Sequence, residues 1–269
     1  MSRLKQTFTN LCQRGRVALV TYITAGDPDP QITVPLMHRL VEAGADILEL
    51  GVPFSDPMAD GPAIQRATER ALSHGVSLRN VLAMVSEFRR QDADTPVVLM
   101  GYANPVERMG YQVFAEAAAQ AGVDGVLMVD VPPEESPAEV FAAQGLDQIF
   151  LLSPTTTGQR MQLIARHASG FVYYVSLKGV TGSTSLDPEE VGARLPAIRQ
   201  LCQLPVGVGF GIRDGESARR IGQFADAVVI GSRIIEAIEQ APRDRILTDV
   251  GQLVGTIRDA LDRPPENAA

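Results

Sequence analysis

Three carboxylates stand close together in residues 48–62, LELGVPFSDPMADGP, and carboxylates in unlike environments can divide acid and base work between them. Glu49 lies inside the apolar run ILELG, where an unpaired buried carboxylate is costly. Asp56 and Asp60 follow in a segment rich in glycine and proline. The spacing indicates one acid on a strand and two on the loop that leaves it.

The alternation of side chains along a strand predicts where Glu49 points. It shares a side with Ile47 and Gly51 and faces away from Leu48 and Leu50. If the two leucines pack against helices, Glu49 faces the open side, where partial desolvation raises the pKa of a carboxyl and suits it to general acid/base chemistry. The alternative is a structural carboxylate paired with a basic residue, but no Lys or Arg lies nearby in the sequence.

The two loop carboxylates have different alternatives. Asp60 directly precedes a Gly-Pro pair and a helical pattern, so on local grounds it could equally cap that helix, with proline near the first helical position. Its loop nevertheless follows the Glu49 strand, so both acids could address one ligand from different sides. Asp56 stands in a Ser-Asp-Pro turn, which fits an exposed turn or an interface contact better than catalysis.

Glycines late in the chain form a second group of candidates. They occur at residues 179–182 (GVTG), 209–211 (GFG) and 231–232 (GS), each time after an apolar segment. Backbone N–H groups at glycines and at a helix N-terminus can bind a phosphate without clashing side chains. Each glycine alone is compatible with a plain turn, but the combination predicts a phosphate site.

Eight apolar segments alternate with helical patterns and would position these groups. We expect strands at residues 17–23, 46–50, 97–102, 125–130, 148–153, 171–176, 205–211 and 227–231. We expect helices at residues 32–43, 62–73, 78–90, 112–121, 138–144, 159–167, 188–201, 216–223 and 246–261. A short amphipathic segment with Leu4, Phe8 and Leu11 precedes the first strand.

Strands that are apolar throughout are typical of parallel sheets covered on both faces. Eight of them with intervening helices predict an α/β fold, a (β/α)8 TIM barrel of eight parallel strands with an extra N-terminal helix. An open, doubly wound sheet is the alternative, but no GxGxxG follows the first strand. In a barrel the candidate residues at strand ends and in the following loops would meet at one mouth.

Composition limits the other possibilities. The 269 residues, 45% of them hydrophobic, predict a single domain over residues 1–269, with a disordered tail from about residue 263. A net charge of -8 without a basic run argues against nucleic-acid or anionic-membrane binding, and no apolar run approaches the ~20 residues of a membrane-spanning helix.

Cysteine and histidine usage points to a reducing cytoplasm and to no metal site. The two cysteines, Cys12 and Cys202, are far apart and indicate neither a disulfide framework nor a zinc site. The N-terminus lacks the apolar core of a signal peptide. No HxH, HExxH or Cys/His cluster is present, so we expect no catalytic metal.

Several segments resemble the tryptophan synthase α-subunit family in order and spacing: LELGVPFSDPMADGPAIQ, LMGYANPV, DVPPEE, YYVSLKGVTG, GFGI and VVIGS. The similarity runs over nearly the whole chain. It implies a (β/α)8 barrel that cleaves indole-3-glycerol phosphate to indole and glyceraldehyde 3-phosphate without a cofactor or metal of its own. It also implies a partner β-subunit that carries pyridoxal phosphate and receives the indole, in an α2β2 heterotetramer.

The resemblance also assigns roles to residues. Glu49 is similar to the family's strand acid/base, Asp60 to the loop carboxylate that holds the indole N–H, and Tyr173 to a tyrosine near the acid/base. The phosphate would lie at Gly182, Phe210, Gly211, Gly231 and Ser232, and the indole pocket would be walled by Tyr22, Met100, Leu127 and Thr181. Loops that face the β-subunit would include Phe54, Asp56, Pro57, Asn104 and Pro132, and residues 178–187 resemble a mobile lid.

Without the resemblance, the residues alone predict a phosphate-binding barrel with two active carboxylates, and other functions stay open. A phosphosugar isomerase or aldolase could use Glu49 as its base, although no clear electrophilic His or Lys partner accompanies it. A barrel that mainly binds and activates a partner subunit is a third possibility. The presence of both Glu49 and Asp60 argues against it, because such a subunit has no need of either.

Overall fold

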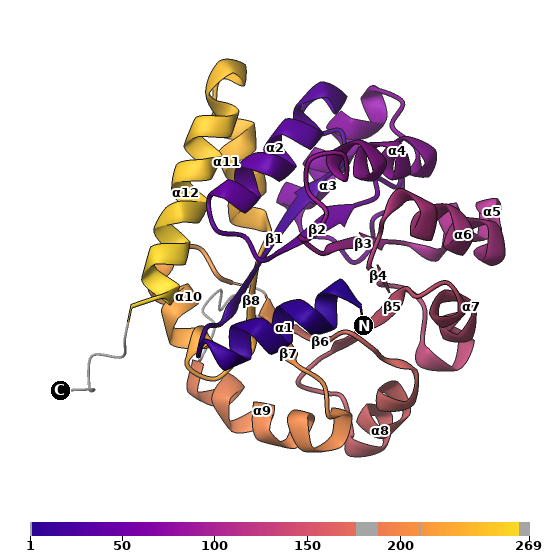
Figure 1. Cartoon of the computed structure of the whole chain (residues 1–269), viewed down its shortest axis with the longest axis vertical. Coiled ribbons are helices and arrows are strands. Elements are labelled where there is room, and N and C mark those ends of the chain that lie inside the picture. The colour runs from indigo at the N-terminus through magenta and orange to yellow at the C-terminus, as the bar shows by residue number, and fades with distance from the viewer. Residues whose placement is uncertain (1, 176–187, 210, 264–269) are drawn as a thin grey trace.

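The computed structural model describes residues 2–175, 188–209 and 211–263. These residues form a closed barrel of eight parallel strands that neighbour one another in chain order (Figure 1). The strands are β1 (Ala18–Thr24), β2 (Ile47–Gly51), β3 (Val97–Gly101), β4 (Gly125–Met128), β5 (Asp147–Leu152), β6 (Val172–Val175), β7 (Val206–Gly209) and β8 (Ala227–Ile230). Pairing of β1 with β8 closes the ring, and the predicted TIM barrel is confirmed.

An outer layer of helices surrounds the strands, one helix after each strand (Figure 1). Its members are α2 (Pro30–Glu42), α4 (Leu78–Phe88), α6 (Tyr111–Ala121), α7 (Ala138–Ala143), α8 (Gly158–His167), α9 (Pro188–Cys202), α10 (Gly215–Gly222) and α12 (Ile246–Leu261). Their apolar faces cover the outer face of the sheet, as the helical spacing of the sequence requires. None of the described helices is long and apolar enough to cross a bilayer.

Further helices interrupt this simple alternation. Helix α1 (Arg3–Gln13) precedes β1, α3 (Pro62–Ser73) precedes α4, α5 (Ala103–Met109) precedes α6, and α11 (Ser232–Gln240) precedes α12. Two short 3-10 turns, η1 (Pro133–Glu135) and η2 (Arg243–Arg245), complete the set within the described residues. The sequence analysis does not predict α5 or α11, although Ile234, Ile235 and Ile238 of α11 are buried at helical spacing.

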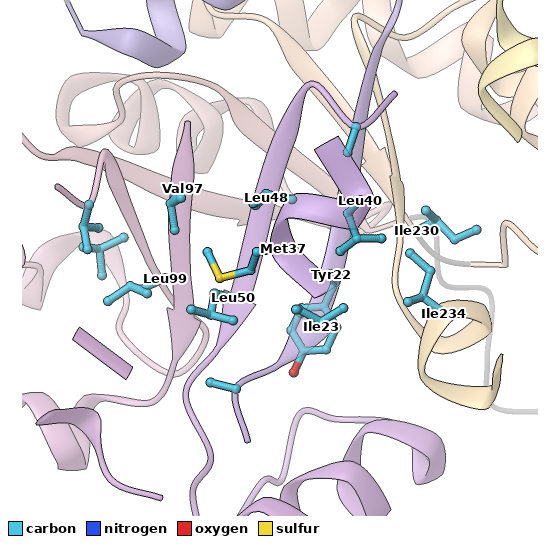
Figure 2. Packing of buried hydrophobic residues seen from close by; sticks show 14 of the residues in the cluster. Tyr22, Ile23, Met37, Leu40, Leu48, Leu50, Val97, Leu99, Ile230 and Ile234 are labelled. Carbon is cyan, nitrogen blue, oxygen red and sulfur yellow. The ribbon is translucent and has the colours of Figure 1, made fainter. Parts of the chain in front are cut away.

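Alternate residues of the strands separate two hydrophobic clusters. Leu48 and Leu50 face outward, and Figure 2 shows them beside Met37 of α2. Ile47 faces inward with Leu127 and other residues that fill the barrel. Glu49 has the same parity as Ile47, so the prediction that it points away from the helices is confirmed.

Helix α1 closes the N-terminal end of the barrel. Its residues Leu4, Phe8 and Leu11 join the inner cluster, and the ring centroids of Phe8 and Phe171 lie 5.7 Å apart. In Figure 1 the helix crosses in front of the ring of strands. The opposite end, where the strands reach their carboxyl ends, is thereby left for the loops that carry the candidate site.

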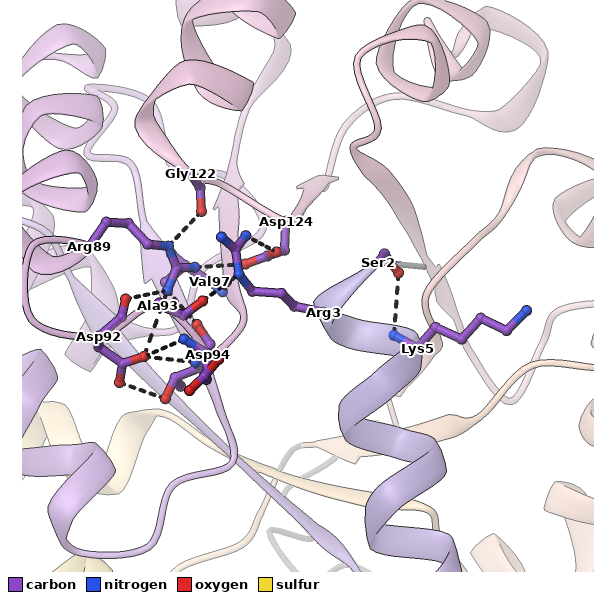
Figure 3. Close-up of polar contacts among 11 residues, drawn as sticks. Ser2, Arg3, Lys5, Arg89, Asp92, Ala93, Asp94, Val97, Gly122 and Asp124 are labelled. Carbon is purple, nitrogen blue, oxygen red and sulfur yellow. Dashed lines mark hydrogen bonds and ion pairs between the residues drawn. The ribbon is translucent and has the colours of Figure 1, made fainter.

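Carboxylates that precede β2, β4 and β8 hold the N-terminal end of the sheet. Each accepts an N–H from the neighbouring strand at 2.8 Å: Asp46 from Leu19, Asp124 from Val97, and Asp226 from Val206. Asp124 also binds Arg89, the C-cap residue of α4, at 2.7 Å and Arg3 of α1 at 2.8 Å (Figure 3). These charge-assisted bonds fix the strands at the end of the barrel away from the site.

Most element bounds differ from the expected ones by one or two residues. The third strand ends at Gly101 because Tyr102 already caps α5, and the fourth ends at Met128 because the chain then turns toward η1. The predicted helices at residues 62–73 and 246–261 have the bounds of α3 and α12.

Candidate active site

Glu49 is the buried acid at the mouth of the barrel. It pairs in register with Tyr22 of β1 and Val98 of β3, and only 1% of it is exposed. Its Oε1 atom has no hydrogen-bond partner among the described residues. Burial, followed by the charge of Asp60, raises the pKa of Glu49 to about 8. The carboxyl therefore carries a proton near neutral pH and has a free oxygen that can exchange it with a ligand.

Two tyrosines, Tyr22 and Tyr173, each pack their hydroxyl group against a glycine at a strand end. The hydroxyl of Tyr22 lies 3.2 Å from Oγ1 of Thr24, and a Cβ atom on Gly51 would come within 2.2 Å of the Tyr22 hydroxyl oxygen. A Cβ atom on Gly209 would likewise come within 2.2 Å of the Tyr173 hydroxyl oxygen. Glycine at these two strand ends is what allows both phenol rings to fit, since any side chain would displace them.

Both phenols stay protonated in this environment. Burial raises the pKa of Tyr22 and of Tyr173, and the charge of a carboxylate raises it further, chiefly that of Asp60 for Tyr22 and that of Glu49 for Tyr173. The rings therefore supply hydroxyl groups, not phenolates, next to the carboxyl.

Asp60 is half-buried in the loop that follows β2. Burial raises its pKa, against the effect of a hydrogen bond that Tyr102 donates to its Oδ2 atom at 3.1 Å. The N-cap of α3 is Gly61, and no side chain caps that helix end. The capping alternative for Asp60 is therefore wrong, and its carboxylate is held by Tyr102 instead.

Tyr102 is a site residue to which the sequence analysis gives no role. It is buried, with 4% of its surface exposed, and it accepts the N–H of Ala59 at 3.0 Å while donating to Asp60. Its ring packs on Phe54, with ring centroids 5.3 Å apart. The available signal was its position directly after the third strand, where an aromatic residue with a polar head reaches the mouth.

The glycine candidates for phosphate binding fall only partly within the described residues. Gly231 is the N-cap of α11 and Ser232 its first residue, so the free N–H groups of a nine-residue helix begin at the end of β8. Gly211 follows β7 with a φ of 76°, which favours glycine. The candidates Gly182, Thr181 and Phe210, and the proposed lid at residues 178–187, lie outside the described residues.

Apolar side chains from neighbouring strands complete the mouth. Met100 of β3 and Leu127 of β4 pair in register, and both belong to the inward-facing set. These two residues and Tyr22, which pairs in register with Glu49, are the described members of the predicted indole-pocket wall. An apolar lining suits an aromatic ring.

The loop between β2 and α3 presents an exposed surface beside the mouth. Met58 is 86% exposed and Asp56 is exposed, with its carboxylate accepting the hydroxyl of Ser55 at 2.6 Å. A groove of ≈ 410 Å³ runs between this loop and α3, lined in part by Phe54 and Pro57. The other interface candidates, Asn104 and Pro132, are exposed and half-buried respectively. An exposed large apolar side chain in such a setting is typical of a binding surface.

Acidic and basic groups at the mouth do not form a metal centre. Within residues 2–175, 188–209 and 211–263, no group of three or more His, Cys, Asp or Glu side chains is arranged to hold a metal ion. The charge of Asp60 instead adds to burial in raising the pKa of Glu49. The arrangement supports proton transfer by a protonated carboxyl beside a second, more accessible carboxylate.

Comparisons with known proteins agree with this geometry. The family model described as tryptophan synthase alpha chain matches residues 8–260. The tryptophan synthase alpha chain of Azoarcus sp. strain BH72 is 63% identical over 267 residues, 98% of each chain, and that of Aromatoleum aromaticum is 63% identical over 265 residues, again 98% of each.

Solved structures give the same result in three dimensions. Tryptophan synthase subunit alpha from Legionella pneumophila strain Paris matches with a TM-score of 0.92 at 46% identity, over 97% of this chain and 99% of that one. A chain of tryptophan synthase from M. tuberculosis matches with a TM-score of 0.86 at 35% identity, over 97% and 100%. The chain therefore belongs to the tryptophan synthase alpha chain family, the lyases that cleave indole-3-glycerol phosphate to indole and glyceraldehyde 3-phosphate.

Proposed function

We propose that Glu49 and Asp60 are the two catalytic carboxylates of this lyase. The observation that carries the proposal is the buried, unpaired carboxyl of Glu49, whose pKa is raised to about 8 at a mouth that it shares with Asp60. A carboxyl in this state can give and take a proton at neutral pH. Asp60, which is half-buried and hydrogen-bonded by Tyr102, is the group better suited to hold a positive charge.

The chemistry needs both groups. Protonated Glu49 donates its proton to C3 of the indole ring, which leaves positive charge at the ring nitrogen. Asp60 accepts a hydrogen bond from the ring N–H and stabilises that charge. The bond between C3 and the glycerol carbon then breaks, its electron pair returns to the ring, and the adjacent hydroxyl becomes the aldehyde. Glu49, now a carboxylate, takes the hydroxyl proton and regains its starting state.

The rest of the mouth binds the substrate in the proposal. The substrate phosphate lies at the N-terminus of α11 and nearby glycines, and the contributing residues are Gly182, Phe210, Gly211, Gly231 and Ser232. The indole ring lies against Tyr22, Met100, Leu127 and Thr181. Tyr173 keeps Glu49 in place and supplies a hydroxyl group beside it. The burial of the inward-facing wall and the free helix N-terminus support these assignments.

A tryptophan synthase β-subunit is the proposed partner, in an α2β2 complex where pyridoxal phosphate belongs to the partner. The proposed contact surface consists of Phe54, Asp56, Pro57, Asn104 and Pro132. Its support is the exposure of Asp56 and Asn104 and the exposed apolar side chain of Met58 in the same loop. A cytoplasmic location is part of the proposal, and the two free cysteines, Cys12 and Cys202, are consistent with it.

Indole release tests the function directly. The purified chain is incubated with indole-3-glycerol phosphate, alone and with a β-subunit, and indole is quantified by chromatography. We expect slow release alone and faster release with the partner, and no indole under either condition contradicts the proposed lyase. Indole-glycerol without the phosphate is the matched substrate: an unchanged KM for it contradicts the proposed phosphate site.

A further inference from the structure

Two of the additional helices, α3 and α11, begin at opposite ends of the proposed substrate site. Helix α3 begins at Pro62, two residues after Asp60, and α11 begins at Ser232, where the phosphate is proposed to bind. They pack against each other, and both contact β1 (Figure 1). Their relative position therefore sets the separation between the group for the indole nitrogen and the groups for the phosphate.

A network of ion pairs joins these two helices. Arg66 of α3 binds both oxygens of Glu239 of α11, at 2.8 and 2.7 Å. Arg70, one turn further along α3, binds Oε1 of the same carboxylate at 2.8 Å. These contacts lower the pKa of Glu239 to about 2, with the hydrogen bond from Arg66 as the largest cause. One carboxylate of α11 thus receives three hydrogen bonds from two arginines of α3.

The same network reaches the loop that follows β1. Arg70 binds Asp27 in a bidentate manner, with its Nε atom 2.6 Å from Oδ1 and its Nη2 atom 3.1 Å from Oδ2. The Asp27 side chain is completely buried. The backbone of this loop also lies against the last turn of α3 and the segment after it, since a Cβ atom on Gly26 would come within 3.3 Å of the Ala71 Cβ atom and 2.5 Å of the Val76 side chain. The ion pairs of Arg66, Arg70, Asp27 and Glu239 therefore connect α3, α11 and the loop after β1.

The geometry distinguishes this network from an ordinary surface ion pair. Isolated exposed ion pairs contribute little to stability. Bidentate arginine–carboxylate contacts in a network are stronger, and their two parallel hydrogen bonds also fix the relative orientation of the two side chains. Arg70 is 28% exposed and Glu239 30%, whereas Arg66 is 49% exposed, so the contact through Arg70 is the part of the network that is better shielded from water. Its contacts run between α3 and α11 and do not run along either helix, so it constrains how the helices sit relative to each other.

We propose that Glu239 and Arg70 are positioning residues that fix the distance between the indole end and the phosphate end of the substrate site. The inference rests on the proposed function, which defines those two ends. A ligand that contacts both ends benefits from a fixed separation, because binding of one end presents the other at a high effective concentration. A ligand that contacts only one end gains nothing from it.

Glu239→Ala is the variant that tests this inference. Loss of the Glu239 carboxylate leaves Arg70 bound to Asp27, so no buried charge loses its partner and the chain is expected to fold. The matched control is Arg243→Gln, which removes the 2.9 Å ion pair between Arg243 and Asp29 in the same region without touching α3. Thermal unfolding of both variants and of the wild-type chain establishes that they are folded.

Three ligands distinguish a change in the distance between the two ends of the site from a general loss of binding. Glycerol 3-phosphate occupies the phosphate end, indole occupies the ring end, and indole-3-propanol phosphate, which cannot be cleaved, occupies both. Their Kd values are measured by calorimetry on the intact wild-type chain and on each variant. The kcat and KM for indole-3-glycerol phosphate are measured alongside, with and without a β-subunit.

In Glu239→Ala we expect Kd for the two-ended ligand to rise about tenfold and Kd for each one-ended ligand to change by less than about twofold. Arg243→Gln is expected to leave all three unchanged. An unchanged Kd for the two-ended ligand, or an equal loss for all three, overturns the inference. A wild-type chain that releases no indole contradicts the proposed function instead, so the two failures are distinguishable.

Discussion

The hydroxyl of Tyr102 joins two loops of the barrel mouth, because it donates to Oδ2 of Asp60 at 3.1 Å and accepts the N–H of Ala59 at 3.0 Å. One side chain after β3 thus holds both the carboxylate and the adjacent backbone of the loop after β2. The contact between the Tyr102 and Phe54 rings adds a second point of attachment to the same loop. The direction of the Asp60 carboxylate therefore depends on a neighbour outside its own loop.

Removal of this hydroxyl in Tyr102→Phe is expected to impair catalysis without unfolding the chain. The hydrogen bond lowers the pKa of Asp60, so its loss raises that pKa, and the ionised carboxylate that the reaction needs is present only at higher pH. We expect kcat/KM to fall about tenfold and the acid limb of its pH profile to shift upward. Tyr111→Phe, which removes a hydroxyl bonded to Glu107 at 2.9 Å, is the control. An acid limb that stays in place in Tyr102→Phe contradicts this role.

Replacement of the buried acid in Glu49→Gln is expected to abolish turnover while leaving binding largely intact. Glutamine has nearly the same shape but cannot donate and recover a proton, so we expect kcat to fall by a factor of at least about 100. Single-turnover indole release gives the rate, and calorimetry with indole-3-propanol phosphate gives the binding. Glu42→Gln, on the exposed face of α2, serves as the control. Wild-type rates in Glu49→Gln would remove this residue from the mechanism.

The barrel and the orientation of Glu49 were predictable because both depend on short-range patterns. Continuous apolar strands require cover on both faces, and the two-residue period that turns Leu48 and Leu50 toward the helices turns Glu49 inward. The missed helix α11 begins two residues after β8 ends and precedes α12, so β8 is followed by two helices where simple alternation predicts one. Local periodicity therefore predicted the barrel strands and their covering helices better than it predicted an additional helix such as α11.

The contacts that direct the loop groups were not predictable from local pattern. Asp60 and Tyr102 are 42 residues apart, and Arg66 and Glu239 are 173 apart. Each pairing depends on where two separate loops or helices are placed by the closed barrel. On local grounds alone Asp60 fitted a helix cap equally well, and only the packing of the loop against Tyr102 decides between the two.

The raised pKa of Glu49 predicts a pH-dependent cost to stability. Its pKa rises from an ordinary value of 4.5 to about 8 in the folded chain. Between these values the folded chain binds a proton that the unfolded chain has lost, so stability falls as pH rises through this window. Glu49→Gln removes this titration and is expected to be more stable than wild type by on the order of a few kcal/mol near pH 9. The difference should vanish toward pH 4.

Urea unfolding of both chains at pH 5, 7 and 9 measures this difference. The comparison between the two chains cancels the titration of other acids, because every other acidic group is present in both. A difference in unfolding free energy that stays constant over this range would show that Glu49 does not hold its proton in the folded chain.

Loss of the carboxylate in Asp124→Ala is expected to destabilise the barrel without altering its chemistry. Asp124 accepts the Val97 N–H and binds Arg3 and Arg89, so its removal leaves the half-buried Arg89 with only the longer, 4.0 Å ion pair to Asp92 at the closed end (Figure 3). We expect the unfolding free energy to fall by about 3–5 kcal/mol, measured by urea denaturation. Asp94→Ala, which removes an exposed carboxylate in the turn between α4 and β3, is the control. Because the site lies at the opposite end of the strands, kcat of the folded Asp124→Ala chain should match that of the wild type. A lower kcat would show that the substitution also disturbs the geometry of the site.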